Sequence, residues 1–438
     1  MKRLLFGVYQ AMILLLLPPL SLYLLRRLIG RPAYRDGVMQ RLGRYPRDFF
    51  KAIEGRQVIW VHAVSVGEVI SSELFIQSLR RRYPKAGIIF STTTPTGQAA
   101  ARQRLKGVDQ FIYFPFDLPW VTRSVVERIS PALFIFLETE LWPNFLRTLS
   151  KKGIPSILIN GRISERGFRR YRRVRFFLSS VLEEVSLFLM QTERDAEKIR
   201  TLGAPSDRVI RTGNMKYDQA ASRGVPKEAG TLRTEIGLAP GERLMIAGST
   251  HEGEEESVLD AYRIIADAIG PMKLLIAPRH LDRLGRVEEL LIQRGMACVR
   301  KTALNRMRNE ELGMRNERVI LLDTLGELDQ YYALADLVFV GGSLVPIGGH
   351  NVLEVAAHRR PVFFGPHMSN FKEIADQLKG SGGGMEVSGG KEMGLQMVWL
   401  MQHPDEMKKR GESAYQVVLA NRGAVMRNLE QVARWLEN

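Results

Sequence analysis

The sequence predicts an α/β protein with two Rossmann-like domains, each built on a parallel sheet. Apolar, β-branched runs of strand length alternate with amphipathic stretches of helical length, and this alternation occurs in two separate blocks. Strands that are apolar along their whole length are typical of parallel sheets, because helices cover both faces of such sheets. A chain of 438 residues also fits two such domains better than one large core.

The two blocks define the expected domains. The strands predicted for the first are QVIWVHA, AGIIFST, QFIYF, ALFIFLE, SILIN and SLFLM, which indicate a domain over residues 37–212. Polar sequence with Gly224, Pro226 and Gly230 predicts a linker over 213–241. The second block contains RLMIAG, KLLIA, RVILLD, DLVFV and PVFFG, and together with closing helices it predicts a domain over 242–438. Parallel sheets bind ligands at the carboxyl ends of their strands, so we expect a substrate cleft between the two sheets.

Residues 1–36 predict a membrane-anchor segment. The run from Leu4 to Leu25 is almost uninterrupted apolar sequence, and basic residues flank it on both sides: Lys2, Arg3, Arg26 and Arg27. Its length would reach across a bilayer core, but Pro18 and Pro19 would kink a helix there. A spanning helix, a helix lying at the membrane interface and a buried core helix therefore remain open. The basic flank favours a cytoplasmic position for the rest of the chain.

The net charge of +16 predicts an anionic partner or surface. The segment Arg166–Phe177 carries six arginines in 12 residues, which fits either a solvated helix face or docking against lipid phosphates. It contains no recognisable nucleic-acid-reading motif, which argues against a nucleic-acid-binding module. The single Cys298 and seven histidines exclude a disulfide framework and favour a reducing compartment.

Three acidic residues follow predicted strands of the first domain. Glu68 lies in SVGEV, where the first strand meets a helix, so it is expected either to compensate the helix dipole or to act as a general base. Glu138 and Glu140 leave the fourth strand in LETELWPN. If the strand persists, alternation places both on one face, where mutual repulsion would raise one pKa; capping of the next helix is the alternative.

The second domain carries candidate anion-binding groups. Arg279 follows the strand KLLIA, where a guanidinium can hold a phosphate. The loop GGSLVPIGGHNVLE joins a strand to a helix, and its glycines would let backbone N–H groups cradle a phosphate. Asn351 and Glu354 fit a capping pair equally well. No Asp-x-Asp or His-Glu-x-x-His sequence occurs, so we expect catalysis without a metal.

A set of motifs in one order over residues 61–371 resembles the Kdo transferase family, the bacterial enzymes that transfer 3-deoxy-D-manno-octulosonic acid. The motifs are VHAVSVGE, STTTPTG, FDLP, ETELWPN, NGRIS, GNMKYD, AGSTHEGEE, APRH, GGSLVPIGGHNVLEVAAH and GPHMSNF. The resemblance implies the GT-B fold, CMP-Kdo as donor, lipid IVA as acceptor and no cofactor. It also implies an inverting reaction at the cytoplasmic face of the inner membrane, with the anionic membrane surface rather than nucleic acid as partner.

The resemblance also implies roles for individual residues. Glu68 resembles the base that deprotonates the acceptor, and Glu138 and Lys216 resemble groups that stabilise the transition state. The positions that match the CMP site are Pro278, Arg279, Leu325, Gly326, Glu327, Asn351, Val352, Leu353 and Glu354. Additional donor or acceptor contacts are expected from Ser249, Thr250, His251, Arg162, Gly349 and His350. A sugar-nucleotide epimerase could share this fold and is the rival enzyme class.

Overall fold

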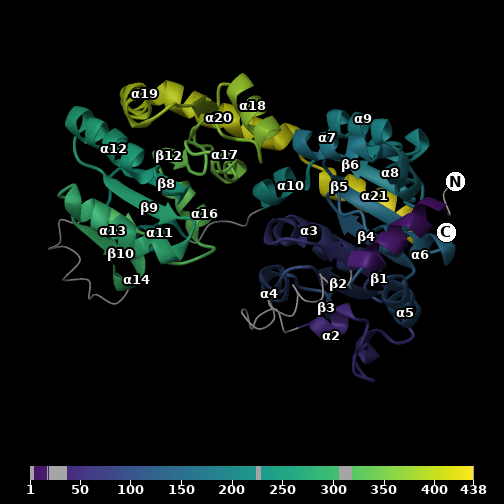
Figure 1. Cartoon of the computed structure of the whole chain (residues 1–438). Coiled ribbons are helices and arrows are strands. Elements are labelled where there is room, and N and C mark those ends of the chain that lie inside the picture. The colour runs from purple at the N-terminus through teal and green to yellow at the C-terminus, as the bar shows by residue number, and fades with distance from the viewer. Residues whose placement is uncertain (1–3, 17, 19–36, 223–227, 305–317, 438) are drawn as a thin grey trace. The chain divides into compact units, whose positions relative to one another are not determined.

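The computed structural model describes residues 4–16, 18, 37–222, 228–304 and 318–437. The chain divides into two compact units, unit 1 with Met1–Gln219 and Arg422–Asn438, and unit 2 with Ala220–Asn421. Each unit contains a seven-stranded parallel sheet flanked by helices, which confirms the predicted fold class (Figure 1).

The sheet of unit 1 has the order β3-β2-β1-β4-β5-β6-β7. Six of its strands lie where the apolar runs predicted them, and the bounds are β1 Val58–Ala63, β2 Gly87–Thr92, β3 Gln110–Tyr113, β4 Leu133–Leu137, β5 Ser156–Gly161 and β6 Leu187–Met190. The sequence did not predict β7, Val209–Arg211, because it is a short edge strand with only one fully buried side chain. The chain runs outward from β1 to β3 and then returns to β4 on the other side of β1, so the topological switch point lies between β1 and β4.

Helices cover both faces of this sheet. They are α2 Val38–Arg41, η2 Lys51–Ile53, α3 Val66–Arg82, α4 Pro95–Arg104, α5 Pro119–Ile129, α6 Pro143–Lys151, α7 Glu165–Arg173, α8 Arg175–Leu182, α9 Glu193–Leu202, η3 Ser206–Arg208, α10 Met215–Ser222 and α21 Ala424–Leu436. Hydroxyl groups cap several of the helix N-termini, for example Ser65 on α3 and Thr94 on α4. Caps of this kind begin the helices immediately after the strands, so the first helical turns lie at the carboxyl edge of the sheet.

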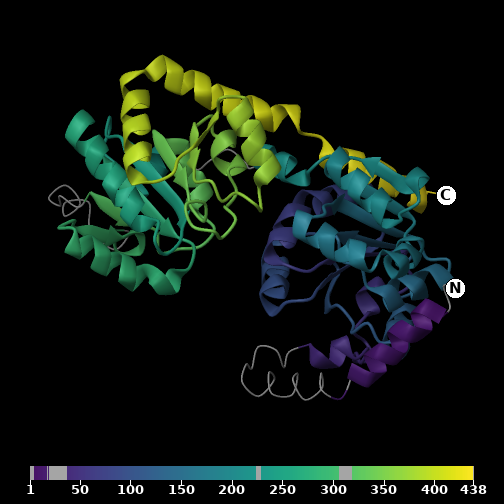
Figure 2. The same ribbon diagram turned by 45° about the horizontal axis from the view of Figure 1, so that its top comes forward.

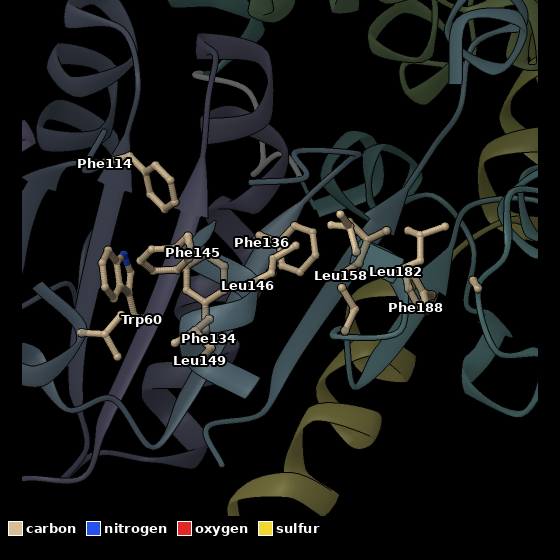
Figure 3. Packing of buried hydrophobic residues seen from close by; sticks show 14 of the residues in the cluster. Trp60, Phe114, Phe134, Phe136, Phe145, Leu146, Leu149, Leu158, Leu182 and Phe188 are labelled. Carbon is tan, nitrogen blue, oxygen red and sulfur yellow. The ribbon is translucent and has the colours of Figure 1, made fainter. Parts of the chain in front are cut away.

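An aromatic cluster forms the core on one face of this sheet (Figure 3). The Trp60 ring meets Phe145 edge-on with 5.1 Å between ring centroids, and Phe134 meets Phe145 at 4.9 Å. Edge-to-face packing of buried rings adds stability beyond the burial of their area. The cluster therefore fixes β1 and β4, the two strands that flank the switch point, against α6.

The sheet of unit 2 has the order β10-β11-β9-β8-β12-β13-β14. Its strands are β8 Leu244–Thr250, β9 Lys273–Pro278, β10 Cys298–Arg300, β11 Val319–Leu321, β12 Leu337–Val340, β13 Val362–Phe364 and β14 Gly384–Glu386. The sequence predicted all of these except β10 and β14, which are three-residue strands at the two edges. Here the switch point lies between β8 and β12.

The helices of unit 2 complete the same architecture. They are α11 Ala229–Glu235, α12 Glu255–Ile269, η4 Leu281–Arg283, α13 Leu284–Gln293, α14 Lys301–Leu304, α16 Leu328–Tyr331, η5 Tyr332–Leu334, α17 Leu353–Ala357, α18 Lys372–Gly380, α19 Gly390–Gln402 and α20 Pro404–Ala420.

Two domain boundaries differ from the sequence expectation. The expected linker over 213–241 contains two helices, α10 and α11. The chain passes from unit 1 to unit 2 within α10, between Gln219 and Ala220. The last helix, α21, belongs to unit 1 and not to the C-terminal domain expected over 242–438. Its Leu429 and Val432 pack into the core of unit 1, and buried Asn428 accepts a hydrogen bond from Thr212 at 2.8 Å. The apolar pattern of α21 predicted a helix but could not show which sheet it covers.

Residues 4–16 of the expected anchor are helical and pack along unit 1 (Figure 2). Phe6 is buried, and its ring lies edge-on to Phe177 of α8 with the centroids 5.8 Å apart. Gln10 donates a hydrogen bond to Asn144 at the start of α6. The rest of the expected anchor, residues 1–3, 17 and 19–36, lies outside the described residues. Within the described part of the chain, no helix is both long enough and apolar enough to cross a membrane.

Candidate active site

The switch point of unit 1 gathers the acidic residues that the sequence placed after separate strands. Glu68 follows β1, and Glu138 and Glu140 follow β4, the neighbouring strand. Their charges interact, since the carboxylates of Glu138 and Glu140 both raise the pKa of Glu68. Open parallel sheets bind ligands at such a point, outside the carboxyl ends of the strands.

Glu68 is held in one orientation by hydrogen bonds to both carboxylate oxygens. The Val64 N–H donates to Oε2 at 2.8 Å, and the Ser65 hydroxyl donates to Oε1 at 2.9 Å. Ser65 also caps α3 by accepting from the Glu68 N–H at 3.4 Å. Glu68 therefore takes part in the hydrogen bonds at the start of α3, in the first turn, where the sequence expected either compensation of the helix dipole or a general base.

Burial raises the pKa of Glu68 to about 7, and the neighbouring charge of Glu138 adds to this effect. The hydrogen bonds from Val64 and Ser65 act in the opposite direction, because they stabilise the carboxylate. The side chain is only 6% exposed. A carboxylate with a pKa near neutrality is basic enough to accept a proton from a substrate and is still ionised in a useful fraction of molecules.

Glu138 and Glu140 do not share a strand face. The sequence placed them on one face on the condition that the strand persists, and this condition is not met, because β4 ends at Leu137 and Glu138 adopts a left-handed backbone conformation with φ of 54°. Such a conformation is costly for a residue with a Cβ, and strain of this kind concentrates at functional sites. The pKa of Glu140 is raised by its burial and by the like charge of Glu138. Glu140 was predicted to follow the fourth strand but was not among the predicted site residues.

Two cations complete the cluster in unit 1. Lys216 lies on α10, and burial lowers the pKa of its ammonium group, as does the charge of Arg162, while Glu138 and Glu68 raise that pKa. Hydrogen bonds fix α10 in place: the Met215 N–H donates to Asn160 Oδ1 at 3.1 Å, and the Gln219 side chain donates to the Ile70 carbonyl at 2.8 Å. The structure thus brings together Glu68, Glu138, Lys216 and Arg162, which lie far apart in the sequence.

The switch point of unit 2 gathers histidines and an arginine. His251 follows β8, His350 lies in the loop after β12, and Arg279 follows β9. The Nε2 atoms of His251 and His350 are 2.8 Å apart, and the two rings are stacked with 5.1 Å between centroids. Burial lowers the pKa of His350 to about 4, and the charge of Arg279 contributes. The Arg279 side chain is exposed and has no hydrogen bond or ion pair with the described residues, and its backbone N–H donates to the Thr250 carbonyl.

Part of the glycine-rich loop that was expected to cradle a phosphate already binds a carboxylate of the chain. The fully buried Glu254 accepts hydrogen bonds from the N–H groups of Gly342, Ser343 and Leu344 at 2.7–2.9 Å. The N–H groups of Gly348 and Gly349 bond to the Gly342 carbonyl. These five N–H groups therefore have partners within the chain, and the helix that follows, α17, has only five residues.

Glycine at position 341 makes this arrangement possible. A Cβ there would lie 2.6 Å from the Ser249 carbonyl oxygen and 2.7 Å from Glu254 Oε2. The loop can approach β8 only without that side chain. Local sequence pattern could not predict this role for Glu254, because its partners lie 88–90 residues further along the chain.

The other positions expected to bind CMP divide into accessible and buried groups. Leu325 and Gly326 are exposed after β11, whereas Glu327 pairs with Lys301 at 2.9 Å. Asn351 donates to Glu354 at 3.1 Å and accepts from the Leu353 N–H at 3.3 Å, but the N-cap of α17 is Val352, which makes no side-chain cap hydrogen bond. The two side chains of the expected capping pair meet, and the Asn351 cap itself does not form. The side chains of the remaining candidates are buried: Thr250, Pro278, Val352 and Leu353. Ser249 is partly buried and has a left-handed backbone with φ of 56°.

No group of three or more His, Cys, Asp or Glu side chains among the described residues is arranged to hold a metal ion.

Comparison with known proteins establishes the family. The profile of the 3-deoxy-D-manno-octulosonic-acid transferase (kdotransferase) family matches residues 36–219. A 3-deoxy-D-manno-octulosonic acid transferase from Haemophilus influenzae is 34% identical over 432 residues, which cover 98% of each chain. This chain belongs to the Kdo transferase family.

Solved structures agree on the fold of this family member. A glycosyltransferase from Rickettsia africae covers 88% of the chain with a TM-score of 0.58 and 12% identity. A UDP-GlcNAc 2-epimerase from Neisseria meningitidis covers 87% with a TM-score of 0.58 and 14% identity. Likeness at this level of identity shows the GT-B-like fold alone, and a transferase and an epimerase share it. Assignment to the Kdo transferase family therefore comes from the sequence relatives.

Proposed function

We propose that this member of the Kdo transferase family transfers Kdo from CMP-Kdo to lipid IVA, with inversion at the anomeric carbon and without a metal ion. The observation that carries the proposal is Glu68, a carboxylate at the switch point of unit 1 that is oriented by two hydrogen bonds and has its pKa raised to about 7. The whole-length similarity to a Kdo transferase supports the choice of sugar.

In the proposed reaction, Glu68 accepts the proton of the lipid hydroxyl. The oxygen then forms a bond to the anomeric carbon of Kdo, and the bond from that carbon to the phosphate oxygen breaks, with its electron pair leaving on CMP. A single displacement of this kind inverts the anomeric configuration. A positioned general base contributes roughly a hundred- to ten-thousand-fold to the rate of such a step.

The other charged groups match the charges that the reaction develops. The anomeric centre gains oxocarbenium character, which the carboxylate of Glu138 would stabilise. The departing phosphate gains negative charge, and Arg279 would pair with it through two parallel hydrogen bonds. The charges of Glu68 and Glu138 both act on Lys216, whose ammonium group would compensate the Kdo carboxylate.

We also propose that unit 1 attaches to the anionic inner face of a membrane. Four apolar side chains form an exposed stripe along the described N-terminal helix: Leu4, Val8, Met12 and Leu15. A cavity of about 300 Å³ beside this helix has four basic side chains in its lining, Arg123, Arg147, Lys151 and Lys152, and one acidic side chain, Glu127, which pairs with Arg123 and Lys152. The helix contacts α8 through Phe177, and α8 follows the arginine-rich helix α7. An apolar stripe next to basic side chains matches acyl chains below a layer of lipid phosphates.

The test of the reaction is mass spectrometry of lipid IVA after incubation with the purified protein and CMP-Kdo. The wild-type protein is expected to add Kdo and release CMP only when the lipid is present. Glu68→Gln is expected to lower turnover by roughly a hundred- to ten-thousand-fold, because the amide cannot accept the proton. Glu73→Gln changes another glutamate of α3 and should leave turnover near the wild-type level. Wild-type turnover in Glu68→Gln would remove Glu68 from the proposed role.

A further inference from the structure

A pair of histidines at the switch point of unit 2 has no role in the reaction as described above. His251 and His350 come from loops 99 residues apart in sequence, and their Nε2 atoms lie at hydrogen-bonding distance, 2.8 Å. One of the two rings must therefore carry a proton on Nε2 and donate it to the lone pair of the other. The Nδ1 atom of the donating ring is then unprotonated.

This arrangement can accept one proton without breaking. A proton added to Nδ1 of the donating ring leaves the Nε2–H···Nε2 hydrogen bond intact and converts it into a charge-assisted bond between an imidazolium and an imidazole. A second added proton would have to go to the accepting Nε2, where two N–H groups would face each other at 2.8 Å. The geometry limits the pair to one additional positive charge.

Burial favours the neutral form of both rings, and the charged groups around the pair add to or oppose this effect. Arg279 and His280, which follow β9, face it, and so does Arg283 of η4. Glu254 and Glu255 oppose these groups from the start of α12. Both acids are engaged, however: Glu254 accepts backbone N–H groups, and Glu255 pairs with Arg283 at 2.9 Å. An incoming phosphate and sugar carboxylate would be the first negative charges here that are not already paired.

We infer that the His251–His350 pair takes up one proton when a nucleotide-activated sugar acid binds to unit 2, so that the nucleotide phosphate meets an imidazolium as well as Arg279. The inference rests on the proposed donor. The added charge lies beside Arg279, where the departing phosphate becomes more negative as its bond to the sugar breaks. The pair supplies positive charge that is present with the ligand and absent without it.

The sign of the pH dependence follows from linkage. Burial and the neighbouring cations lower the pKa of His350 to about 4 without a ligand, and a bound anion raises it. Between these two pKa values, binding takes up a proton, so affinity falls as pH rises and levels off above the pKa of the complex. For one proton the slope is at most about tenfold per pH unit.

The experiment is isothermal titration calorimetry with the methyl ester of CMP, whose phosphate diester does not titrate near neutral pH. Binding is measured between about pH 5 and pH 8 in buffers with different ionisation enthalpies, which gives the number of protons taken up. The wild-type protein is expected to take up close to one proton per ligand at the acidic end. His350→Gln and His251→Gln should each abolish this uptake, and His403→Gln, an exposed histidine of the same unit, should keep it.

Wild-type binding without proton uptake would overturn the inference and leave the proposed function standing, and this measurement needs no variant to fold. Uptake that persists unchanged in both glutamine variants would also overturn it. If the wild-type protein binds neither the ester nor CMP itself at any pH, the proposed donor is wrong and the inference fails with it.

Discussion

The chemistry of unit 1 depends on how single residues set the pKa of Glu68. Burial and the carboxylate of Glu138 raise this pKa, and the hydrogen bonds from Val64 and Ser65 lower it. The result, about 7, is the balance of these opposing effects. A base that works at neutral pH needs this balance, because full hydrogen bonding alone would make the carboxylate too weak a base.

The balance predicts the pH dependence of the reaction. In the proposed mechanism the deprotonated carboxylate is the active form, so kcat/KM should rise about tenfold per pH unit below the pKa of Glu68 and become constant above about pH 7. Steady-state measurements of kcat/KM below and above pH 7 would give the midpoint of this pH profile, the pH at which kcat/KM is half of its maximal value.

Two substitutions should move this midpoint in opposite directions. Ser65→Ala removes a hydrogen bond that stabilises the carboxylate, so the midpoint should move to higher pH. Glu138→Gln removes a neighbouring negative charge, so the midpoint should move to lower pH even though the maximal rate falls. A midpoint that stays in place in both variants would show that another group limits the profile.

At the scale of elements, the carboxylate of Glu254 holds the loop after β12 in place. Glu254 lies immediately before α12, and it joins the turn after β8 to the loop after β12 through Gly342, Ser343 and Leu344. The bond from the His251 N–H to Glu254 Oε2 at 2.9 Å closes the turn itself. The loops that carry His251 and His350 are therefore fixed by one buried side chain.

Replacement of Glu254 should destabilise unit 2. In Glu254→Gln, one carboxylate oxygen becomes an amide donor. Each oxygen accepts two backbone N–H groups, so two of these groups lose their acceptor. A buried donor without a partner costs about 1–3 kcal/mol, so a loss of about 2–6 kcal/mol is expected. The free energy of unfolding, measured by urea denaturation, reports this loss. The matched variant Glu256→Gln changes an exposed glutamate of α12 and should lie within about 0.5 kcal/mol of the wild type.

At the scale of the whole molecule, the C-terminal helix returns to the first unit. Asp218 of α10 accepts hydrogen bonds from the Gly423 and Val425 N–H groups, at 2.6 and 3.2 Å. Leu429 and Val432 then bury their side chains in the core beside α3. The unit that carries Glu68 and Lys216 is thus completed only when the end of the chain has been made.

Truncation before Arg422 should therefore destabilise unit 1. It removes the apolar face of α21 and leaves Thr212 and Asp218 without their partners. We expect a clearly lower melting temperature, rapid proteolysis of unit 1 and loss of activity. A chain that lacks only residues 437 and 438 loses surface pairs worth about 0–1 kcal/mol and should melt close to the full chain. Equal melting of the two truncated chains would contradict the role of α21.

Membrane attachment also belongs to this scale, because it combines the apolar stripe with the basic charge of unit 1. Val8→Asp places a charge in the stripe, so binding to vesicles that contain phosphatidylglycerol should fall by about tenfold or more in a sedimentation assay. Gln103→Asp adds the same charge on α4, away from the stripe, and should reduce binding much less. Higher salt should weaken binding of all the proteins through screening of the basic side chains. Equal binding by the two variants would show that the stripe does not enter the lipid.

The sequence by itself determined the fold class and the longer strands, because burial on both faces of a parallel sheet requires continuous apolar runs such as those of β1 and β4. It also placed Glu68, Glu138 and Arg279 at the carboxyl ends of strands, since strand ends can be read from local pattern. Only the tertiary structure decided which strand ends are neighbours, that Glu254 binds part of the glycine-rich loop, that His251 meets His350 and that α21 covers the first sheet. These features depend on contacts between distant segments, and local periodicity carries no information about the partner of a buried charge or of an apolar helix face.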